Sequence, residues 1–529
     1  MKRLQPPAVG IVLLLALTLL GWRTLDDYGI SWDEAIQRTH GRVSLDYAFD
    51  KLGIDAVALE PQYALESYPW AHYGMLYQLT SSLLERRLGW SDDPFAYYRL
   101  RHALNFFLYL IALICFYQML RLRWPAGSWF PLLGTAMLVF SPRLYGHAFF
   151  NPKDHVLLVG YVIASYTLLR YLRGPTLSAL LMHALATAIA LNTRLPALMI
   201  VVVTLGALGW EQIERGRGSW RPTRHLVLYL LASFLLTIPF FPYLWEDTWS
   251  RLIAAFSEMS AFEWGGHNLL FGNRIPATDV PAYYIPVWIA ITTPLVFFLL
   301  ILYGLVATVV RLGKNVRSRR PWRDYREQFD LVQFALAVGP VLAVILLDST
   351  LYNGWRHLHF VYPALTCLAV TAVAGLQKRY RWLIYGALAL EFLLTAVAMV
   401  RYHPHQYVYF NEVISGEPLG ARFDMDYWGT GFREAFVTLA RSVPPGETRT
   451  VFCEEWPCVD NLAALPPPLR SRLTHTTDSL RADYLATHFI YRDFKAASNR
   501  EGTYSAPVLE LRPAGHLTIG IYRIDPPPP

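Results

Sequence analysis

An acidic pair, Asp33 and Glu34, follows shortly after the first apolar stretch of the chain, in D-D-Y-G-I-S-W-D-E-A-I-Q-R. A carboxylate at the mouth of a cavity can act as a general base, because it can take a proton from an attacking hydroxyl or amine. Asp33 and Glu34 are the candidates for that role. Ser31 and Glu34 also have the spacing of a capping box, in which first-turn acids only stabilise a helix start. The spacing predicts a helix beginning after Ser31 and leaves both interpretations open.

The residues after Ser31 repeat with helical spacing. One face of the predicted helix is polar and the opposite face is apolar, with Asp33, Gln37, His40 and Ser44 on the first and Ile36, Val43 and Tyr47 on the second. A two-faced helix of this kind is expected to lie along a membrane surface.

Basic residues form the second candidate group. Lys153 and Asp154 lie in F-F-N-P-K-D-H, where Asn151 and Pro152 favour a helix start. Arg194 lies in L-N-T-R-L-P, and Arg356 follows Tyr352 and Asn353 in L-Y-N-G-W-R-H-L-H-F-V-Y-P. An arginine can bind a phosphate through two hydrogen bonds, while a lysine acts as a point charge. Snorkelling at the membrane boundary is the alternative explanation for each cation taken alone.

Other chemistries find less support. Several histidines, among them His72 and His147, fall on the same predicted side, but no H-E-x-x-H spacing accompanies them. The sequence has no P-loop, no G-x-G-x-x-G and no G-x-S-x-G, which argues against a nucleotide-driven pump or a serine hydrolase of the usual kind. We expect no required cofactor and leave a divalent cation possible.

The composition indicates a membrane protein. Of 529 residues, 54% are hydrophobic and 16% are charged, against roughly 25% charged residues in soluble proteins. Apolar runs long enough to cross about 30 Å of hydrocarbon recur along the chain. We expect eleven spans, at residues 8–22, 100–120, 129–150, 156–172, 176–191, 195–210, 225–245, 285–310, 331–347, 357–376 and 382–400.

The charge distribution predicts an orientation. The N-terminus and every second loop together hold 20 basic residues and only four acidic ones. Lys2, Arg3, Arg217 and Arg319 are among the basic residues. Since cytoplasmic loops are enriched in Lys and Arg, the N-terminus is expected on the cytoplasmic side of the membrane. The net charge of +7 therefore implies no nucleic-acid partner.

The same orientation places two larger segments outside the cytoplasm. They are the first loop, residues 24–98, and the tail, residues 401–529. We interpret residues 1–400 as the catalytic membrane domain. The tail is expected to form a small α/β domain, with strands near 448–452, 489–492 and 517–523 and a frayed end at the closing prolines 526–529.

Four cysteines are present. Cys115 and Cys367 lie inside predicted spans and are expected to be small apolar side chains. Cys453 and Cys458, in C-E-E-W-P-C, are candidates for a short disulfide, because an extracytoplasmic compartment oxidises thiols.

The order of these motifs resembles the GT-C glycosyltransferases, in particular the branch of the protein O-mannosyltransferases and the lipid A aminoarabinose transferase. The segments that carry the resemblance are S-W-D-E, F-F-N-P-K-D, N-T-R-L-P, Y-N-G-W-R-H-L-H-F-V-Y-P, H-P-H-Q-Y-V-Y-F-N-E and D-Y-W-G. The resemblance as a whole extends over most of residues 1–435, and the residues after 435 carry no recognised motif. The aminoarabinose transferase is expected to show D-E-x-R-Y where this chain has D-E-A-I-Q-R, so the sugar and the acceptor stay unassigned.

The resemblance implies a sugar donor on a polyprenyl phosphate, and a lipid, glycan or protein acceptor on the outer side of a bacterial inner membrane. It also implies that Asp33 is the base, with Glu34 beside it and Asp154 as a second acid. Lys153, Arg194 and Arg356 would bind the phosphate. We count His72, His147, Tyr352 and Asn353 as further cavity candidates. Direct displacement would invert the anomeric carbon.

Two other functions remain open. A lipid or solute transporter or flippase would be expected to show broken helices, repeats or ionisable residues at mid-membrane, where Glu391 is nearly the only charge here. A polysaccharide ligase or polymerase would share the lipid-linked donor and the outer site.

Overall fold

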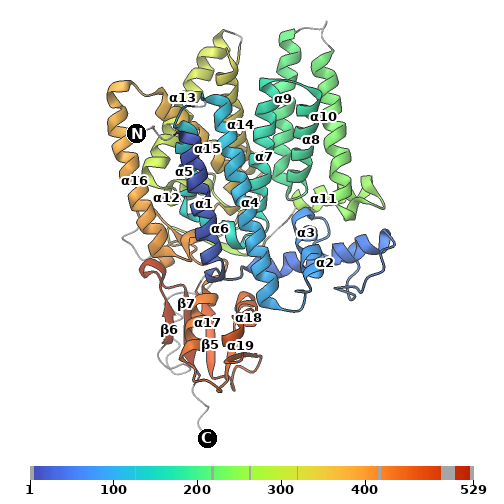
Figure 1. Ribbon diagram of the computed structural model, residues 1–529, viewed down its shortest axis with the longest axis vertical. Coiled ribbons are helices and arrows are strands. Elements are labelled where there is room, and N and C mark those ends of the chain that lie inside the picture. The colour runs from blue at the N-terminus through green and yellow to red at the C-terminus, as the bar shows by residue number, and fades with distance from the viewer. Residues whose placement is uncertain are drawn as a thin grey trace.

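The computed structural model describes residues 5–125, 127–215, 220–260, 262, 264–318, 320–414, 419–489 and 507–524. Some features named above lie outside these residues, namely Lys2, Arg3, Arg217, Arg319, residues 490–492 and the prolines 526–529. Within them the chain is mostly helical, with one hairpin and one five-stranded sheet (Figure 1).

Long apolar helices form the body of the molecule. In the described part of the chain, nine helices are long and apolar enough to cross a membrane. They contain α1 (Pro6–Thr24), α4 (Pro94–Arg123), α7 (Asp154–Arg173), α9 (Leu198–Arg215), α10 (Arg221–Thr237), α13 (Leu295–Arg317), α14 (Tyr325–Leu346), α15 (Tyr362–Gly375) and α16 (Arg381–Tyr402). Two shorter apolar helices are α5 (Phe130–Val139) and α8 (Leu177–Leu191). Each of the eleven predicted spans therefore contains an apolar helix.

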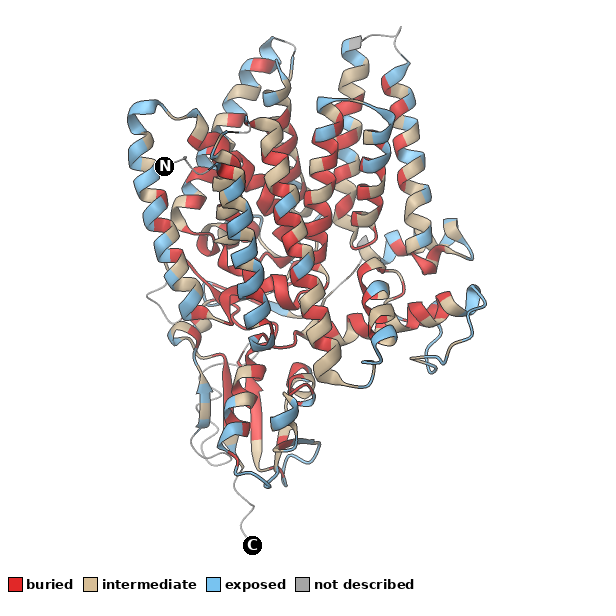
Figure 2. Ribbon diagram, in the orientation of Figure 1, coloured by how far each residue is buried: buried red, intermediate tan, exposed pale blue. Residues whose placement is uncertain are grey.

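The outward faces of these helices are apolar and exposed. Figure 2 shows α16 as exposed and intermediate residues along most of its length, and its side chains at Leu390, Leu393 and Val400 are among the exposed large hydrophobic residues. Exposed apolar side chains in such number are expected where hydrocarbon replaces water. The prediction of a multi-pass helical membrane protein is confirmed.

Two predicted spans are interrupted. The span expected at 129–150 divides into α5 and α6 (Pro142–Phe150), and the span expected at 285–310 divides into α12 (Tyr284–Thr292) and α13. A proline stands at each break, because proline fits the start of a helix but has no N–H with which to continue one. The prediction of two continuous helices is wrong here. The first break is bridged by Ser141, whose hydroxyl lies 2.8 Å from the Tyr362 hydroxyl of α15.

Shorter elements collect at one end of the bundle. They are α2 (Trp32–Lys51), α3 (Leu76–Leu88), α11 (Thr248–Ser260) and the hairpin of β1 (His267–Leu270) and β2 (Asn273–Pro276). Figure 1 shows α2 lying across the direction of the long helices. The polar face predicted for α2 is largely buried, since Gln37, His40 and Ser44 are each at most 5% exposed.

A buried carboxylate explains part of this burial. Glu85 of α3 accepts a hydrogen bond from Nε of Arg38 in α2 at 2.9 Å, and it forms an ion pair with Arg101 of α4. Arg101 also donates to the Gln78 side chain at 2.7 Å. Polar residues are tolerated between the three helices because they satisfy one another there.

The C-terminal region forms a separate small core against α17 (Gly431–Ser442). Its sheet has the order β4-β3-β5-β7-β6, with β3 parallel to β4 and β5, and β7 antiparallel to β5 and β6. The strands are β3 (Arg449–Cys453), β4 (Leu473–Thr476), β5 (Tyr484–His488), β6 (Pro507–Leu511) and β7 (Ile519–Arg523); the remaining helices are α18 (Trp456–Ala463) and α19 (Pro467–Arg470). The small α/β unit that the sequence predicted is confirmed.

Replacement of Glu85 by Ala should destabilise the packing of α2, α3 and α4, because it leaves Arg38 and Arg101 buried without their anion. Removing one partner of a buried ion pair costs about 3–5 kcal/mol. We expect a clear fall in the unfolding temperature of the purified protein in detergent. Glu66→Ala, at an exposed position between α2 and α3, is the control. It should leave the unfolding temperature within a degree or two of the wild-type value. Equal effects of the two substitutions would contradict the account.

Candidate active site

Asp33 stands in the first turn of α2, on a helix start held by a capping box. The Ser31 N–H donates to Oε2 of Glu34 at 2.7 Å, and the Ser31 side chain caps the Glu34 N–H in return. The Ser31 hydroxyl also donates to the Phe150 carbonyl at the end of α6, at 2.8 Å. The start of α2 is therefore attached to the start of α7 through the residue that ends α6.

The two acids of the pair have different surroundings. Glu34 is 2% exposed, and its Oε1 lies 3.0 Å from Nε2 of His102 in α4. Its carboxylate is thus occupied by the cap and by His102. The Asp33 side chain keeps 21% of its surface exposed. Only Asp33 faces accessible space.

Asp154 is the second carboxylate and is 2% exposed in the first turn of α7. Asn151 prepares this turn, because its Oδ1 accepts the N–H groups of Lys153 at 3.2 Å and Asp154 at 2.8 Å. A carboxylate in the first turn is also favoured by the helix dipole. The Asn-Pro-Lys-Asp sequence folds as the helix start that its composition predicted.

Arg356 connects the two carboxylates. Its Nη1 lies 3.3 Å from Oδ2 of Asp33 and 3.1 Å from Oδ2 of Asp154. Arg194 pairs with the other oxygen of Asp154. The four side chains come from α2, α7 and the segments that precede α9 and α15, and their charges alternate. We call this set, together with Lys153, the charged cluster.

Lys153 completes the charged cluster. Its ammonium lies 3.7 Å from the centre of the Tyr73 ring, a cation–π contact. Burial and the nearby positive charge of Arg194 lower the pKa of Lys153 to about 7, although the negative charge of Asp33 acts in the opposite direction. With Lys153 protonated, three cations face two anions. The charged cluster then carries one net positive charge.

A strained turn delivers Arg356. Asn353 and Gly354 have φ angles of 56° and 72°, which asparagine and glycine tolerate better than other residues. The Asn353 N–H donates to Oδ1 of Asn268 in β1 at 3.0 Å, and the Gly354 N–H donates to the Tyr284 hydroxyl at 3.1 Å. The hairpin and α12 therefore hold the turn that places Arg356.

Aromatic rings cover the guanidinium of Arg356. Its centre lies 4.3 Å from the Trp428 ring and 4.8 Å from the Tyr352 ring. Trp428 also accepts the Trp32 N–H on its carbonyl at 3.1 Å. The D-Y-W-G loop thus contacts both Arg356 and the start of the helix that carries Asp33.

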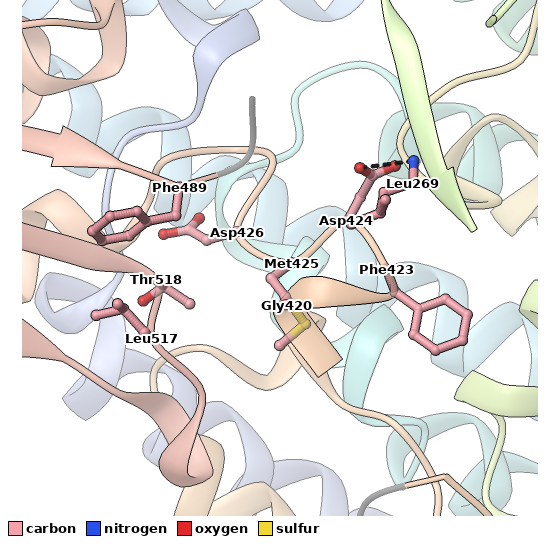
Figure 3. Close-up of a pocket in the computed structure, with 9 residues that line it drawn as sticks. All are labelled: Leu269, Gly420, Phe423, Asp424, Met425, Asp426, Phe489, Leu517 and Thr518. Carbon is pink, nitrogen blue, oxygen red and sulfur yellow. Dashed lines mark hydrogen bonds between the residues drawn. The ribbon is translucent and has the colours of Figure 1, made fainter. Parts of the chain in front are cut away.

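A small cavity lies beside this loop (Figure 3). Its volume is about 10 Å³, and its lining includes Asp424 and Asp426, which leaves room for about one water molecule. Oδ1 of Asp424 accepts the Leu269 N–H at 3.2 Å, while its Oδ2 is buried without a hydrogen-bond partner among the described residues. The cavity is too small for a sugar.

The structure brings together most residues that the sequence singled out. Asp33, Lys153, Asp154, Arg194 and Arg356 meet in the charged cluster, with Tyr352 against it. The others lie around it. His147 is buried behind Asn151, with its Nδ1 2.8 Å from the Asn151 amide. His72 packs on Tyr73, with ring centres 4.7 Å apart. Cys453 at the end of β3 and Cys458 in α18 form a disulfide in the C-terminal region.

Three contributors were not assigned by the sequence reasoning. Tyr73 lies in an ordinary aromatic loop sequence, and Asn151 was considered only as a helix start. Trp428 belongs to a segment that carried the resemblance. The neighbouring Gly429, which has a φ of 68°, is the residue in the sequence that could have indicated a tight turn in this loop. Within the described residues, no group of three or more His, Cys, Asp or Glu side chains is arranged to hold a metal ion.

No family model matches the chain, and no curated protein sequence matches it. Among solved structures, ArnT from Cupriavidus metallidurans in the apo state matches over 97% of this chain and 98% of that chain, with 14% identity and a TM-score of 0.48. The same protein bound to undecaprenyl phosphate matches with 15% identity, a TM-score of 0.45 and 97% of each chain.

An oligosaccharyltransferase from Archaeoglobus fulgidus in the apo form also matches, over 90% of this chain and 69% of that chain, with 10% identity and a TM-score of 0.47. The site described above rests on the contacts of this structure and not on these similarities.

The buried Asp424 should make stability depend on pH. Burial raises the pKa of Asp424 to about 7, although the Leu269 N–H and the charge of Arg143 lower it. Because the folded pKa exceeds the unfolded value, the stabilising contribution is complete at low pH and is lost as the pH rises towards 7. We expect Asp424→Asn to raise the unfolding temperature, relative to the wild type, increasingly between pH 5 and pH 8. Asp279→Asn, at an exposed position, is the control. Its unfolding temperature should differ from that of the wild type by the same amount across this pH range.

Proposed function

We propose that this chain is a membrane glycosyltransferase that moves a sugar from a polyprenyl-phosphate donor to an acceptor hydroxyl or amine. One observation supports this most directly: an accessible carboxylate, Asp33, lies in the same charged cluster as three cations. The reaction needs a base for the acceptor and fixed positive charge for the leaving phosphate. A polysaccharide ligase or polymerase is the same proposal with a glycan as acceptor.

The cations suit a phosphodiester. Arg356 and Arg194 supply planar donor groups, and Lys153 supplies a point charge. A sugar phosphodiester carries a single negative charge, which matches the one net positive charge of the charged cluster. Binding would neutralise the cluster, and the guanidinium groups would then stabilise the charge that builds on the leaving oxygen.

The bond changes follow from these positions. The acceptor oxygen or nitrogen attacks the anomeric carbon and gives its proton to a carboxylate oxygen of Asp33. The bond between the anomeric carbon and the phosphate oxygen breaks, and polyprenyl phosphate leaves with that electron pair. A single displacement inverts the anomeric carbon. Asp154 would hold Arg356 and Arg194 in place, and Glu34 would hold the helix start, so neither needs to exchange a proton.

We further propose that the site faces away from the cytoplasm. Figure 1 shows the end of α9, the start of α10 and the end of α13 at the end of the bundle opposite the C-terminal sheet. In the sequence, these helix ends border the loops that join α9 to α10 and α13 to α14. These loops are among the basic ones, and basic loops favour the cytoplasm. The charged cluster lies at the other end, near the start of α2. The donor would therefore be a lipid-linked sugar of the outer leaflet, and a nucleotide sugar would not be needed there.

A transporter or flippase is the second candidate, and the two broken helices favour it. At one break, the buried Glu391 of α16 accepts the Val296 N–H at 3.2 Å. A carboxylate that accepts a first-turn amide stabilises the start of α13, which offers a structural reason for its presence in the membrane. A test of lipid movement in vesicles that hold the protein separates the two candidates, since a transferase needs no net movement.

Asp33→Asn should abolish sugar transfer. The amide keeps the size of the side chain but cannot accept the proton, and loss of a general base costs about 10²- to 10⁴-fold in rate. The measurement is transfer from a polyprenyl-phosphate sugar by the purified variant, together with its affinity for polyprenyl phosphate, which should change much less. Asp55→Asn, in an exposed position of the same loop, is the control. Full activity of Asp33→Asn would rule out the base assignment.

Lys153 should make donor binding depend on pH. With a pKa of about 7, its charge is lost as the pH rises from 6 to 8, so the affinity for an anion should fall by up to about tenfold. A short prenyl phosphodiester is the suitable probe, because its own charge does not change in this range. Lys153→Arg should bind it with little pH dependence. A fall in affinity of the same size in the arginine variant would show that another group titrates.

A further inference from the structure

The segment that leads into α2 has an extended backbone and needs partners. After the short helix Leu25–Asp27, the chain is extended at Tyr28 and again at Ser31. Backbone N–H and C=O groups that are buried in such a segment must be satisfied from elsewhere. Asp33 follows immediately, so whatever holds this segment also sets the position of the proposed base.

Asn461 of α18 forms hydrogen bonds with both backbone polar groups of one residue in this segment. The Ile30 N–H donates to Oδ1 of Asn461 at 2.9 Å, and Nδ2 of Asn461 donates to the Ile30 carbonyl at 2.9 Å. The same Nδ2 donates to the Pro457 carbonyl at 2.7 Å. Asn461 is 0% exposed. A side-chain amide offers one donor group and one acceptor, as a peptide group does, so Asn461 pairs with Ile30 as a neighbouring strand would.

Other contacts of the segment also come from the C-terminal region. Arg433 donates to the Asp26 carbonyl from Nε at 3.3 Å and from Nη2 at 3.1 Å. The Trp32 N–H binds the Trp428 carbonyl. Gly29 passes so close to the Thr430 carbonyl that a Cβ atom would stand 2.0 Å from its oxygen. Between residues 26 and 32 the segment is therefore held at several points, with Asn461 near the middle.

Asn461 is itself held firmly. The preceding residue, Asp460, accepts a hydrogen bond from the Tyr98 hydroxyl of α4 at 3.0 Å. The disulfide of Cys453 and Cys458 joins the end of β3 to α18. Helix α18 is thus fixed to the small sheet on one side and to the membrane bundle on the other.

We propose that Asn461 is a positioning residue for the transfer reaction, which fixes the Ile30 backbone and through it the orientation of the Asp33 carboxylate. This inference rests on the proposed function. Asn461 pairs with the chain three residues before Asp33, and none of its hydrogen bonds goes to a member of the charged cluster. Loss of its hydrogen bonds should therefore lower the rate of the chemical step and leave donor binding intact.

Asn461→Ala tests the inference. We expect kcat for sugar transfer to fall on the order of 10- to 100-fold, because small displacements of a catalytic group have effects of this size. The KM for the donor and the affinity for polyprenyl phosphate should stay within about threefold. Hydrogen exchange at the Ile30 amide should become faster. Asn461→Asp keeps an acceptor for that amide but has no donor for the Ile30 carbonyl. Its kcat should therefore lie between that of the wild type and that of Asn461→Ala.

The matched control is Val451→Ala. Val451 is a buried residue of β3 in the core of the same region, and its loss should lower stability without a change at the Ile30 amide. A fall in kcat of equal size in Val451→Ala would overturn the inference, as would an unchanged kcat in Asn461→Ala. Absence of transfer by the wild-type chain would contradict the proposed function itself, whereas equal activity of the wild type and Asn461→Ala contradicts only the role of Asn461.

Discussion

The candidate site depends on one guanidinium group shared between two carboxylates. Arg356 is 5% exposed, and a buried charge of this kind is tolerated only when its partners and their geometry are supplied in full. Asp33 and Asp154 supply the charge, and the Trp428 and Tyr352 rings cover the flat faces. The helix starts, the strained turn and the D-Y-W-G loop all serve to bring these few groups to one place.

The fold meets this demand with interruptions of regular structure. Helix α6 starts at the proline break and ends at Phe150, and the next residue, Asn151, caps the turn that holds Asp154. The Asn353–Gly354 turn uses positive φ angles to start the segment of Arg356. These positions cost conformational energy locally. They are maintained because side chains of neighbouring elements form hydrogen bonds with the backbone groups that regular structure does not pair, as Asn268 and Tyr284 do at the turn.

Local sequence was sufficient for much of this. Apolar periodicity located the helices, proline and asparagine marked the start of α7, and the Ser31–Glu34 spacing predicted the capping box that the structure contains. It could not show which interpretation held for each acid, because that depends on His102 and Arg356, which approach from distant parts of the chain. The proline breaks were not predicted, because the apolar composition continues across them. The burial of His40 and Ser44 was not predicted either, because it depends on the helices that pack over them.

Asn461 and Ile30 also give the molecule a fixed order of completion. Asp33 is synthesised early, before most of the membrane helices exist, whereas its arginine partner and its backbone clamp are made hundreds of residues later. During insertion, the segment ahead of α2 has to wait without its hydrogen bonds until α18 has been made and has reached the same side. A chain cut short before that point would hold the reacting carboxylate on an unsupported helix start. Maturation of the site is in this way tied to the arrival of the small α/β unit that contains α18.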